Sequence, residues 1–120
     1  MELTLDQALQ KGVEAHKAGQ LQEADRYYTA ILKAHPKHPD ANHNIGLIAV
    51  ELGRTIDSLP FFEMAIKENP KIVQYWLSYI NVLIKLDRIY EAEAAFSEAI
   101  NKGIKEKDIY QIKQKIKSSF

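Results

Sequence analysis

An internal repeat of 34 residues constrains the fold of this chain more than any other feature of its sequence. When the sequence is shifted against itself by one period, small residues fall on small residues and aromatic residues on aromatic ones. Gly12 matches Gly46 and Gly19 matches Gly53, small residues recur at Ala24, Ser58 and Ala92, and aromatic residues recur at Tyr28, Phe62 and Phe96. The chain therefore divides into three units, 5–38, 39–72 and 73–106.

Each unit is expected to contain two helices. Apolar side chains recur at helical spacing through the units, as in residues 59–66. Gly19 and Gly53 interrupt this pattern midway through the first two units. Pro36 and Pro70 end it, because proline excludes helical geometry from the residue before it. The sequence therefore predicts an all-α fold of three helical hairpins.

The positions of these residues resemble the tetratricopeptide repeat: a small residue early in the first helix, an alanine and an aromatic residue in the second, and a proline near the end. The resemblance covers residues 5–106 and implies an α-solenoid of helix-turn-helix repeats forming a single domain over residues 1–120. The third unit departs from the pattern, with Ile80 and Asp87 in place of glycines and Ile104 in place of the proline. Trp76 stands where the family favours tryptophan.

A C-terminal capping helix is predicted at about 106–119. Ile109, Ile112, Ile116 and Phe120 form a narrow apolar stripe, and lysines occupy the remaining faces. The end helix of a stacked array needs this combination, because one face packs on the preceding repeat and the others meet water.

A weaker resemblance points to repeat regions that precede glycosyltransferase or sulfotransferase domains in some bacterial proteins. It rests on the stretches 38–46, 58–62 and 75–80. This resemblance implies a repeat arm of a larger protein and carries over no catalytic residue.

In the tetratricopeptide repeat family, the first helices of successive units line a concave groove that holds a peptide or helix of another protein. Transferred position by position, this places Asp6, Leu9, Val13, His16 and Lys17 of the first unit, Asp40, His43, Asn44, Leu47, Val50 and Glu51 of the second, and Gln74, Leu77, Asn81, Ile84 and Lys85 of the third in the groove. Many of these side chains are aliphatic, and an exposed apolar strip rimmed by charge marks an interaction surface. The expected partner is an amphipathic helix or an extended segment. The alternative is that the chain's own capping helix or a second copy covers the strip, making the protein a self-assembling module.

One subgroup of the family holds the terminal carboxylate of chaperone tails with lysines and asparagines in the groove. Asn44 matches one of those positions. Leu9, Val13, Gln74 and Ser78 occupy the others, so this mode of capture is not expected here.

Other classes of function have little support in the composition. The 16 basic and 16 acidic residues cancel, so neither nucleic acid nor a membrane surface is an expected partner. The absence of cysteine fits a cytoplasmic protein. Nothing resembles a phosphate loop or a nucleophile elbow, so no enzyme activity and no cofactor are expected. His16, His38 and His43 could meet across neighbouring helices, but they lack the spacing of metal ligands.

Overall fold

A computed structural model describes residues 3–120, and all regular secondary structure in this range is helical. The α-helices are α1 (Leu5–Lys17), α2 (Leu21–Ala34), α3 (Pro39–Glu51), α4 (Thr55–Glu68), α5 (Val73–Lys85), α6 (Ile89–Asn101) and α7 (Tyr110–Ser118). A 3-10 turn, Glu106–Asp108, precedes α7. Within the described range, no helix is both long and apolar enough to span a bilayer.

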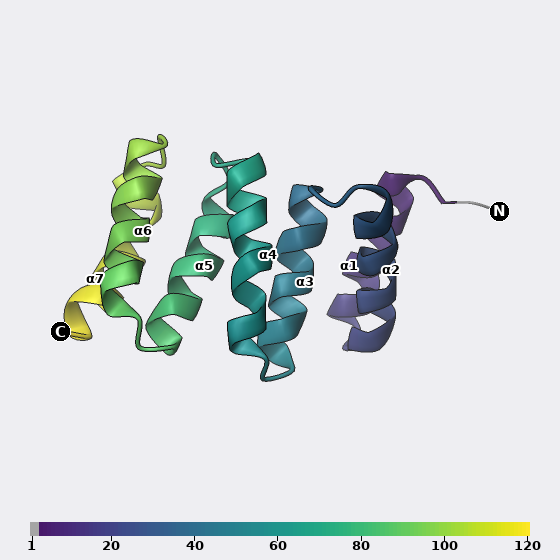
Figure 1. The fold of residues 1–120 in the computed structure, drawn as a ribbon, viewed down its shortest axis with the longest axis horizontal. Helices are drawn as coiled ribbons and strands as arrows, with labels where there is room; N and C mark the ends of the chain where they lie inside the picture. The colour runs from purple at the N-terminus through teal and green to yellow at the C-terminus, as the bar shows by residue number, and fades with distance from the viewer. Residues whose placement is uncertain (1–2) are drawn as a thin grey trace.

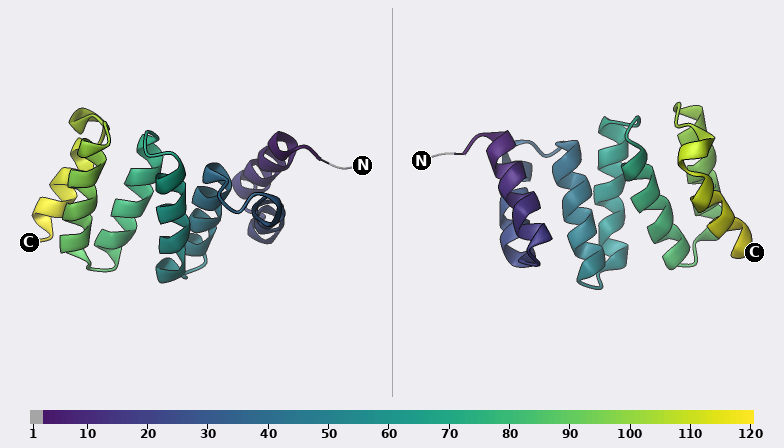
Figure 2. Two further views of the ribbon diagram at one scale, coloured as in Figure 1. Left: turned by 45° about the horizontal axis from the view of Figure 1, so that its top comes forward. Right: turned by 180° about the vertical axis from the view of Figure 1, so that it is seen from behind.

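The helices form a two-layer array with a length of 51 Å, a width of 28 Å and a thickness of 20 Å. Consecutive helices run in opposite directions, so α1–α2, α3–α4 and α5–α6 are hairpins placed side by side (Figure 1). The helices α1, α3, α5 and α7 form one layer, which faces the viewer in the right panel of Figure 2, and α2, α4 and α6 form the other. The predicted α-solenoid of three hairpins and a capping helix is confirmed.

The helix ends follow local sequence rules. Thr4 caps α1 by accepting a hydrogen bond from the Gln7 backbone N–H, while the Gln7 side chain accepts one from the Thr4 N–H. His38 caps α3 in a similar way, because its Nδ1 accepts from the Ala41 N–H at 3.1 Å, and Pro39 follows at the first helical position. The first helices of the first two repeats therefore begin at side-chain caps, whereas α5 begins after Ile72 without one.

Within the first two hairpins, the early glycine lies directly against the aromatic residue that recurs in each unit. A Cβ added to Gly12 would lie 2.5 Å from the Tyr28 ring, and one added to Gly46 would lie 2.7 Å from the Phe62 ring. Each glycine therefore makes room for an aromatic ring, and both rings are fully buried.

The third hairpin solves the same packing problem with different residues. Ile80 replaces the glycine and is fully buried, while Phe96 at the aromatic position is only partly buried. Asp87 replaces the turn glycine and takes the same left-handed conformation, with φ of 60° against 78° and 79° at Gly19 and Gly53. The turn geometry is thus preserved although the glycine is lost.

The C-terminal helix α7 packs on α5 and α6 through Ile109, Ile112 and Ile116, which are all buried. The regular α-helix begins at Tyr110, where the sequence had predicted a helix from about residue 106, because the preceding residues form the 3-10 turn. Phe120 lies outside the buried stripe and is 63% exposed.

Candidate functional site

The candidate partner-binding surface is the layer formed by α1, α3, α5 and α7, which we call the first-helix face. The six aliphatic side chains predicted for its floor are all partly buried: Leu9, Val13, Leu47, Val50, Leu77 and Ile84. Leu47, Val50, Leu77 and Ile84 pack against the main apolar core, and Leu9 packs against a smaller cluster around Tyr28. These five side chains therefore take part in the helix packing, and all six expose part of their surface.

A cavity of about 330 Å³ opens on the first-helix face between the first and second repeats. Its lining comes from both repeats and includes six residues: Val13, His16, Lys17, Tyr28, Asn44 and Glu51. Five of them belong to the groove transferred from the family pattern, and Tyr28 was expected only as a core residue. The structure thus brings an aliphatic side chain, a lysine, a histidine, an amide and a carboxylate to one hollow.

Each polar group of this cavity has a different bonding state. His16 Nε2 lies 2.9 Å from Glu51 Oε2, which ties the end of α1 to the end of α3. Lys17 is exposed and makes no ion pair within residues 3–120. The Tyr28 hydroxyl is buried, and its geometry allows no hydrogen bond with the described residues. Burial raises its pKa, although the nearby Asn44 amide acts in the opposite direction. A buried hydroxyl without a partner is unfavourable, so a polar atom at this position would be favourably bound.

Neighbouring first helices are joined by polar pairs between residues 35 positions apart. His16 and Glu51 form the first pair. In the second, the Tyr75 hydroxyl donates a short hydrogen bond to Asp40 Oδ1. In the third, His43 Nε2 lies 2.8 Å from Ser78 Oγ.

His43 lies below the first-helix face and is not part of the accessible surface. It is 5% exposed, and its ring centroid lies 4.9 Å from that of Tyr75 and 5.5 Å from that of Phe62. Burial lowers the pKa of His43 below 6.5, although the Asn44 amide and the Asp40 carboxylate act in the opposite direction. At neutral pH the imidazole is therefore uncharged.

The histidines do not meet as the sequence had suggested. His16 bonds to Glu51, His43 bonds to Ser78, and His38 caps its own helix, so the three rings have different partners. Within residues 3–120, no three His, Cys, Asp or Glu side chains are grouped so that they could hold a metal ion.

The capping helix meets the third repeat's part of the predicted groove. Lys115 Nζ on α7 donates to Asn81 Oδ1 at 3.0 Å, across a separation of 34 residues. Leu77 and Ile84 pack against the same core cluster as Ile112 and Ile116. Gln74, Lys85 and Asp40 are exposed, as is Asp6 at the start of α1. The capping helix thus occupies only part of the third repeat's share of the first-helix face.

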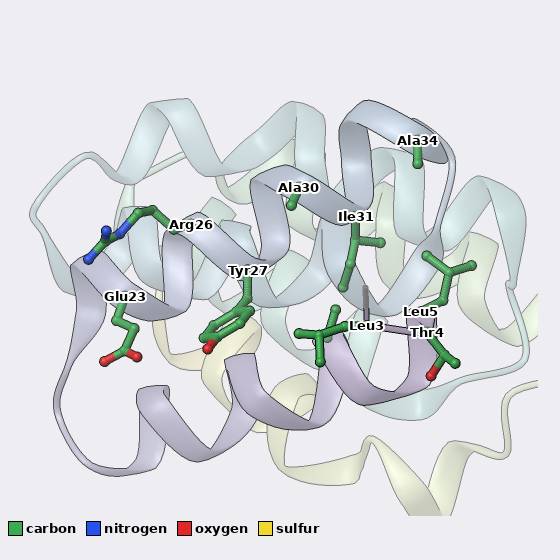
Figure 3. A pocket seen from close by; sticks show the side chains of 10 residues that line it. Leu3, Thr4, Leu5, Glu23, Arg26, Tyr27, Ala30, Ile31 and Ala34 are labelled. Carbon is green, nitrogen blue, oxygen red and sulfur yellow. The ribbon is translucent and has the colours of Figure 1, made fainter. Parts of the chain in front are cut away.

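A larger cavity lies elsewhere, at the N-terminal end of the array. It has a volume of about 760 Å³, and Figure 3 shows its lining side chains on α1, α2 and the segment before α1. Leu5, Ala8, Tyr27, Ala30 and Ile31 give it an apolar wall, with Glu23 and Arg26 at one side. None of the predicted groove residues lines it. In an array of stacked repeats this end corresponds to the face that a preceding unit would cover.

Comparison with known proteins gives matches in both sequence and structure. A family described as "Tetratricopeptide repeat" matches residues 9–71. Human trafficking protein particle complex subunit 12 is 33% identical over 75 residues, which is 62% of this chain and 10% of that protein. The chain thus spans about a tenth of the length of this curated relative.

Solved structures with the same arrangement include the TPR2B domain of yeast Sti1, described as a complex with pHsp70. It superposes with a TM-score of 0.82 at 18% identity, covering 97% of this chain and 98% of that domain. A tetratricopeptide repeat protein from Parabacteroides merdae gives a TM-score of 0.84 at 23% identity, covering 96% of this chain and 45% of that protein. At these identities the likeness concerns the fold.

Proposed function

The chain belongs to the tetratricopeptide repeat family, and we propose that it captures a segment of another protein on its first-helix face, between the first and second repeats. At the coarser level it is a protein-interaction repeat module. The observation that carries the finer proposal is the cavity where α1 meets α3, which unites Val13, His16, Lys17 and Asn44 with an unpartnered Tyr28 hydroxyl.

The chemistry of the cavity favours a segment with one aliphatic and one acidic side chain. Val13, together with the partly exposed Leu9, Leu47 and Val50, offers apolar surface to an aliphatic anchor. Lys17 has no acidic partner among the described residues and can therefore pair with a carboxylate of the segment. Asn44 and the Tyr28 hydroxyl add hydrogen-bonding groups at the floor.

The third repeat contributes less in this proposal. Asn81 is already bonded to Lys115 of the capping helix, and His43 and Ser78 are buried against each other. A segment in extended or helical form would therefore run across α1 and α3, and any contact with Gln74 or Lys85 would be peripheral.

The test is selection from a random peptide library on the immobilised protein, followed by binding measurements with the selected peptides. Val13→Glu should weaken binding at least about tenfold, because a carboxylate would replace apolar contact and repel an acidic residue. Thr29→Glu on α2 is a matched control outside the cavity, and it should leave the affinity unchanged. The proposal would be overturned if Val13→Glu left the affinity unchanged and the selected peptides shifted NMR signals of the protein only around the N-terminal cavity.

A further inference from the structure

Among the described residues, four of the five most exposed large apolar side chains lie beside the turns between first and second helices or at the C-terminus, and the fifth, Tyr110, is 55% exposed at the start of α7. Tyr90 is 78% exposed, Ile56 66%, Phe120 63% and Leu52 53%. Leu52 and Ile56 flank the turn between α3 and α4, and Leu86 and Tyr90 flank the turn between α5 and α6. We call Leu52, Ile56, Leu86, Tyr90 and Phe120 the turn strip. Leu86 is partly buried and packs against the main core, and the other four side chains are exposed.

The repeat itself places these residues in line. Leu52, Leu86 and Phe120 follow one another at intervals of one period, as do Ile56 and Tyr90. In the first repeat the same two positions hold Ala18 and Gln22, so the strip is confined to the second and third repeats and the C-terminus. The two turns and the C-terminus lie along one edge of the array, the lower edge in Figure 1.

Two observations bring neighbouring members of the turn strip together. Ile56 and Leu86 line one shallow cavity of about 370 Å³ that crosses from the second hairpin to the third. The rings of Tyr90 and Phe120 lie with their centroids 5.5 Å apart. Exposed apolar side chains that adjoin in this way mark an interaction surface, whereas single scattered ones need no explanation.

Charged residues beside the strip make it complementary to itself. The α3–α4 turn carries Arg54 and Asp57, and the α5–α6 turn carries Asp87, Arg88 and Glu91. Arg88 pairs with Glu91 at 2.7 Å. Arg54, Asp57 and Asp87 make no ion pair within residues 3–120. A two-fold axis between the turns would bring Arg54 of one copy to the acidic α5–α6 turn of the other.

We propose that the turn strip is a two-fold dimer interface, in which Leu52 and Ile56 of one copy pack against Leu86 and Tyr90 of a second copy. A two-fold contact uses the same patch on both copies, so both the apolar and the charged contacts form twice. No residue of the turn strip lines the cavity proposed for peptide capture, although Glu51 of that cavity directly precedes Leu52 of the strip.

The size and charge of the molecule fit this proposal. The whole edge measures 51 by 20 Å, and the strip takes up about two-thirds of it, or roughly 700 Å². Two such surfaces would bury about 1,400 Å² in total, within the range of about 1,200–2,000 Å² for stable interfaces. The formal net charge is zero, so no long-range repulsion opposes self-association.

The experiment is sedimentation equilibrium of the full chain at about 100 µM and at tenfold dilutions, since a dimer responds to concentration by mass action. The wild-type protein should give twice the monomer mass of 13.7 kDa. Ile56→Glu and Tyr90→Glu should each raise the dimer dissociation constant at least about tenfold. Both side chains are largely exposed in the monomer, so far-ultraviolet circular dichroism should show unchanged helicity.

Ile72→Glu is the matched control, because Ile72 is an exposed isoleucine on the opposite edge, between α4 and α5. It should leave the dimer intact. A wild-type monomer at the highest concentration, or a dimer that persists in both strip variants, overturns the proposal. If the monomer then sediments with phosphatidylcholine–phosphatidylserine vesicles, the strip belongs to a membrane surface, and if not, to a foreign protein.

Discussion

His43 Nε2 lies 2.8 Å from Ser78 Oγ, and this bond joins two first helices across a separation of 35 residues. The separation is one residue longer than the sequence repeat, as it is for His16 with Glu51 and for Asp40 with Tyr75. The first residue in each such pair therefore faces the residue that comes directly after its own equivalent in the next repeat. Directional bonds thus fix the register between neighbouring repeats, in addition to apolar packing.

Removing the Ser78 hydroxyl should expose the value of this bond. Ser78→Ala should lower the free energy of unfolding by about 1–2 kcal/mol, because the buried His43 Nε2 loses its partner. The measurement is urea denaturation followed by circular dichroism. Ser97→Ala, at an exposed position of α6, is the control and should change stability by less than about 0.5 kcal/mol. Equal stabilities for the two variants would contradict the assignment.

The burial of His43 also predicts a pH dependence of stability. Its pKa is lowered in the folded state by burial. Below about pH 6.5, His43 is therefore protonated more in the unfolded chain than in the folded chain. Stability from this group is therefore complete above pH 6.5 and decreases as the pH falls through the folded-state pKa. His43→Gln removes the titrating group, so its melting temperature should fall less between pH 7.5 and about pH 5 than that of the wild type. Identical pH profiles for the two proteins would show that His43 is not the source.

The sequence predicts the backbone of this fold well because its repeat period agrees with the positions of its helix-ending glycines and prolines. Gly53 and Pro70 mark the turn and the end of the second unit, and the structure places the α3–α4 turn and the end of α4 at those residues. Even in the third unit, where Asp87 replaces the glycine, the turn occurs at the expected position. A single residue can depart from the pattern because packing against the neighbouring units also holds the hairpin in its geometry.

The binding surface was harder to predict. A position transferred from the family pattern indicates which side of the helix a side chain is on, but not how deeply it is buried. His43 belongs to the groove by position, but the ring of Tyr75 from the next repeat lies against it and covers it. The turn strip was missed although its period is readable in Leu52, Leu86 and Phe120. Phe120 had been assigned to the apolar stripe of the capping helix, and only the structure shows that its ring turns to Tyr90.

The close fit of Gly46 against Phe62 predicts strong intolerance to a methyl group. Gly46→Ala would place a Cβ 2.7 Å from the buried ring, so the helices must move apart. The free energy of unfolding should fall by about 1–3 kcal/mol, although alanine has the higher helix propensity. Gly46→Ala should cost less stability when it is introduced into a Phe62→Leu variant than into the wild type, because leucine leaves more room for the added methyl group. Additive losses in this double-mutant cycle would argue against the contact.

The small positions of the second helices should not accept charge. Ala24 is fully buried where α2 meets its neighbours, so Ala24→Glu should cost about 3 kcal/mol or more. Ala94→Glu on α6 is the control, because Ala94 is exposed and the variant should remain nearly as stable as the wild type. Thermal denaturation of both variants checks the prediction, and an unchanged melting temperature for Ala24→Glu would place the repeat in a different register.

The left-handed turn residues predict opposite effects of substitution at equivalent positions. Asp87 has φ of 60°, a conformation that costs a side-chain-bearing residue more than glycine, so Asp87→Gly should relieve strain and raise stability by up to about 1 kcal/mol. Gly53→Ala introduces the same strain at φ of 79° without any side-chain contact, since open space surrounds its Cβ position, and should lower stability by about 1 kcal/mol. Glycine also makes the unfolded chain more flexible, which opposes the gain in Asp87→Gly. The loss at Gly53 should therefore exceed the gain at Asp87 in urea denaturation, and a stabilising Gly53→Ala would contradict the conformational argument.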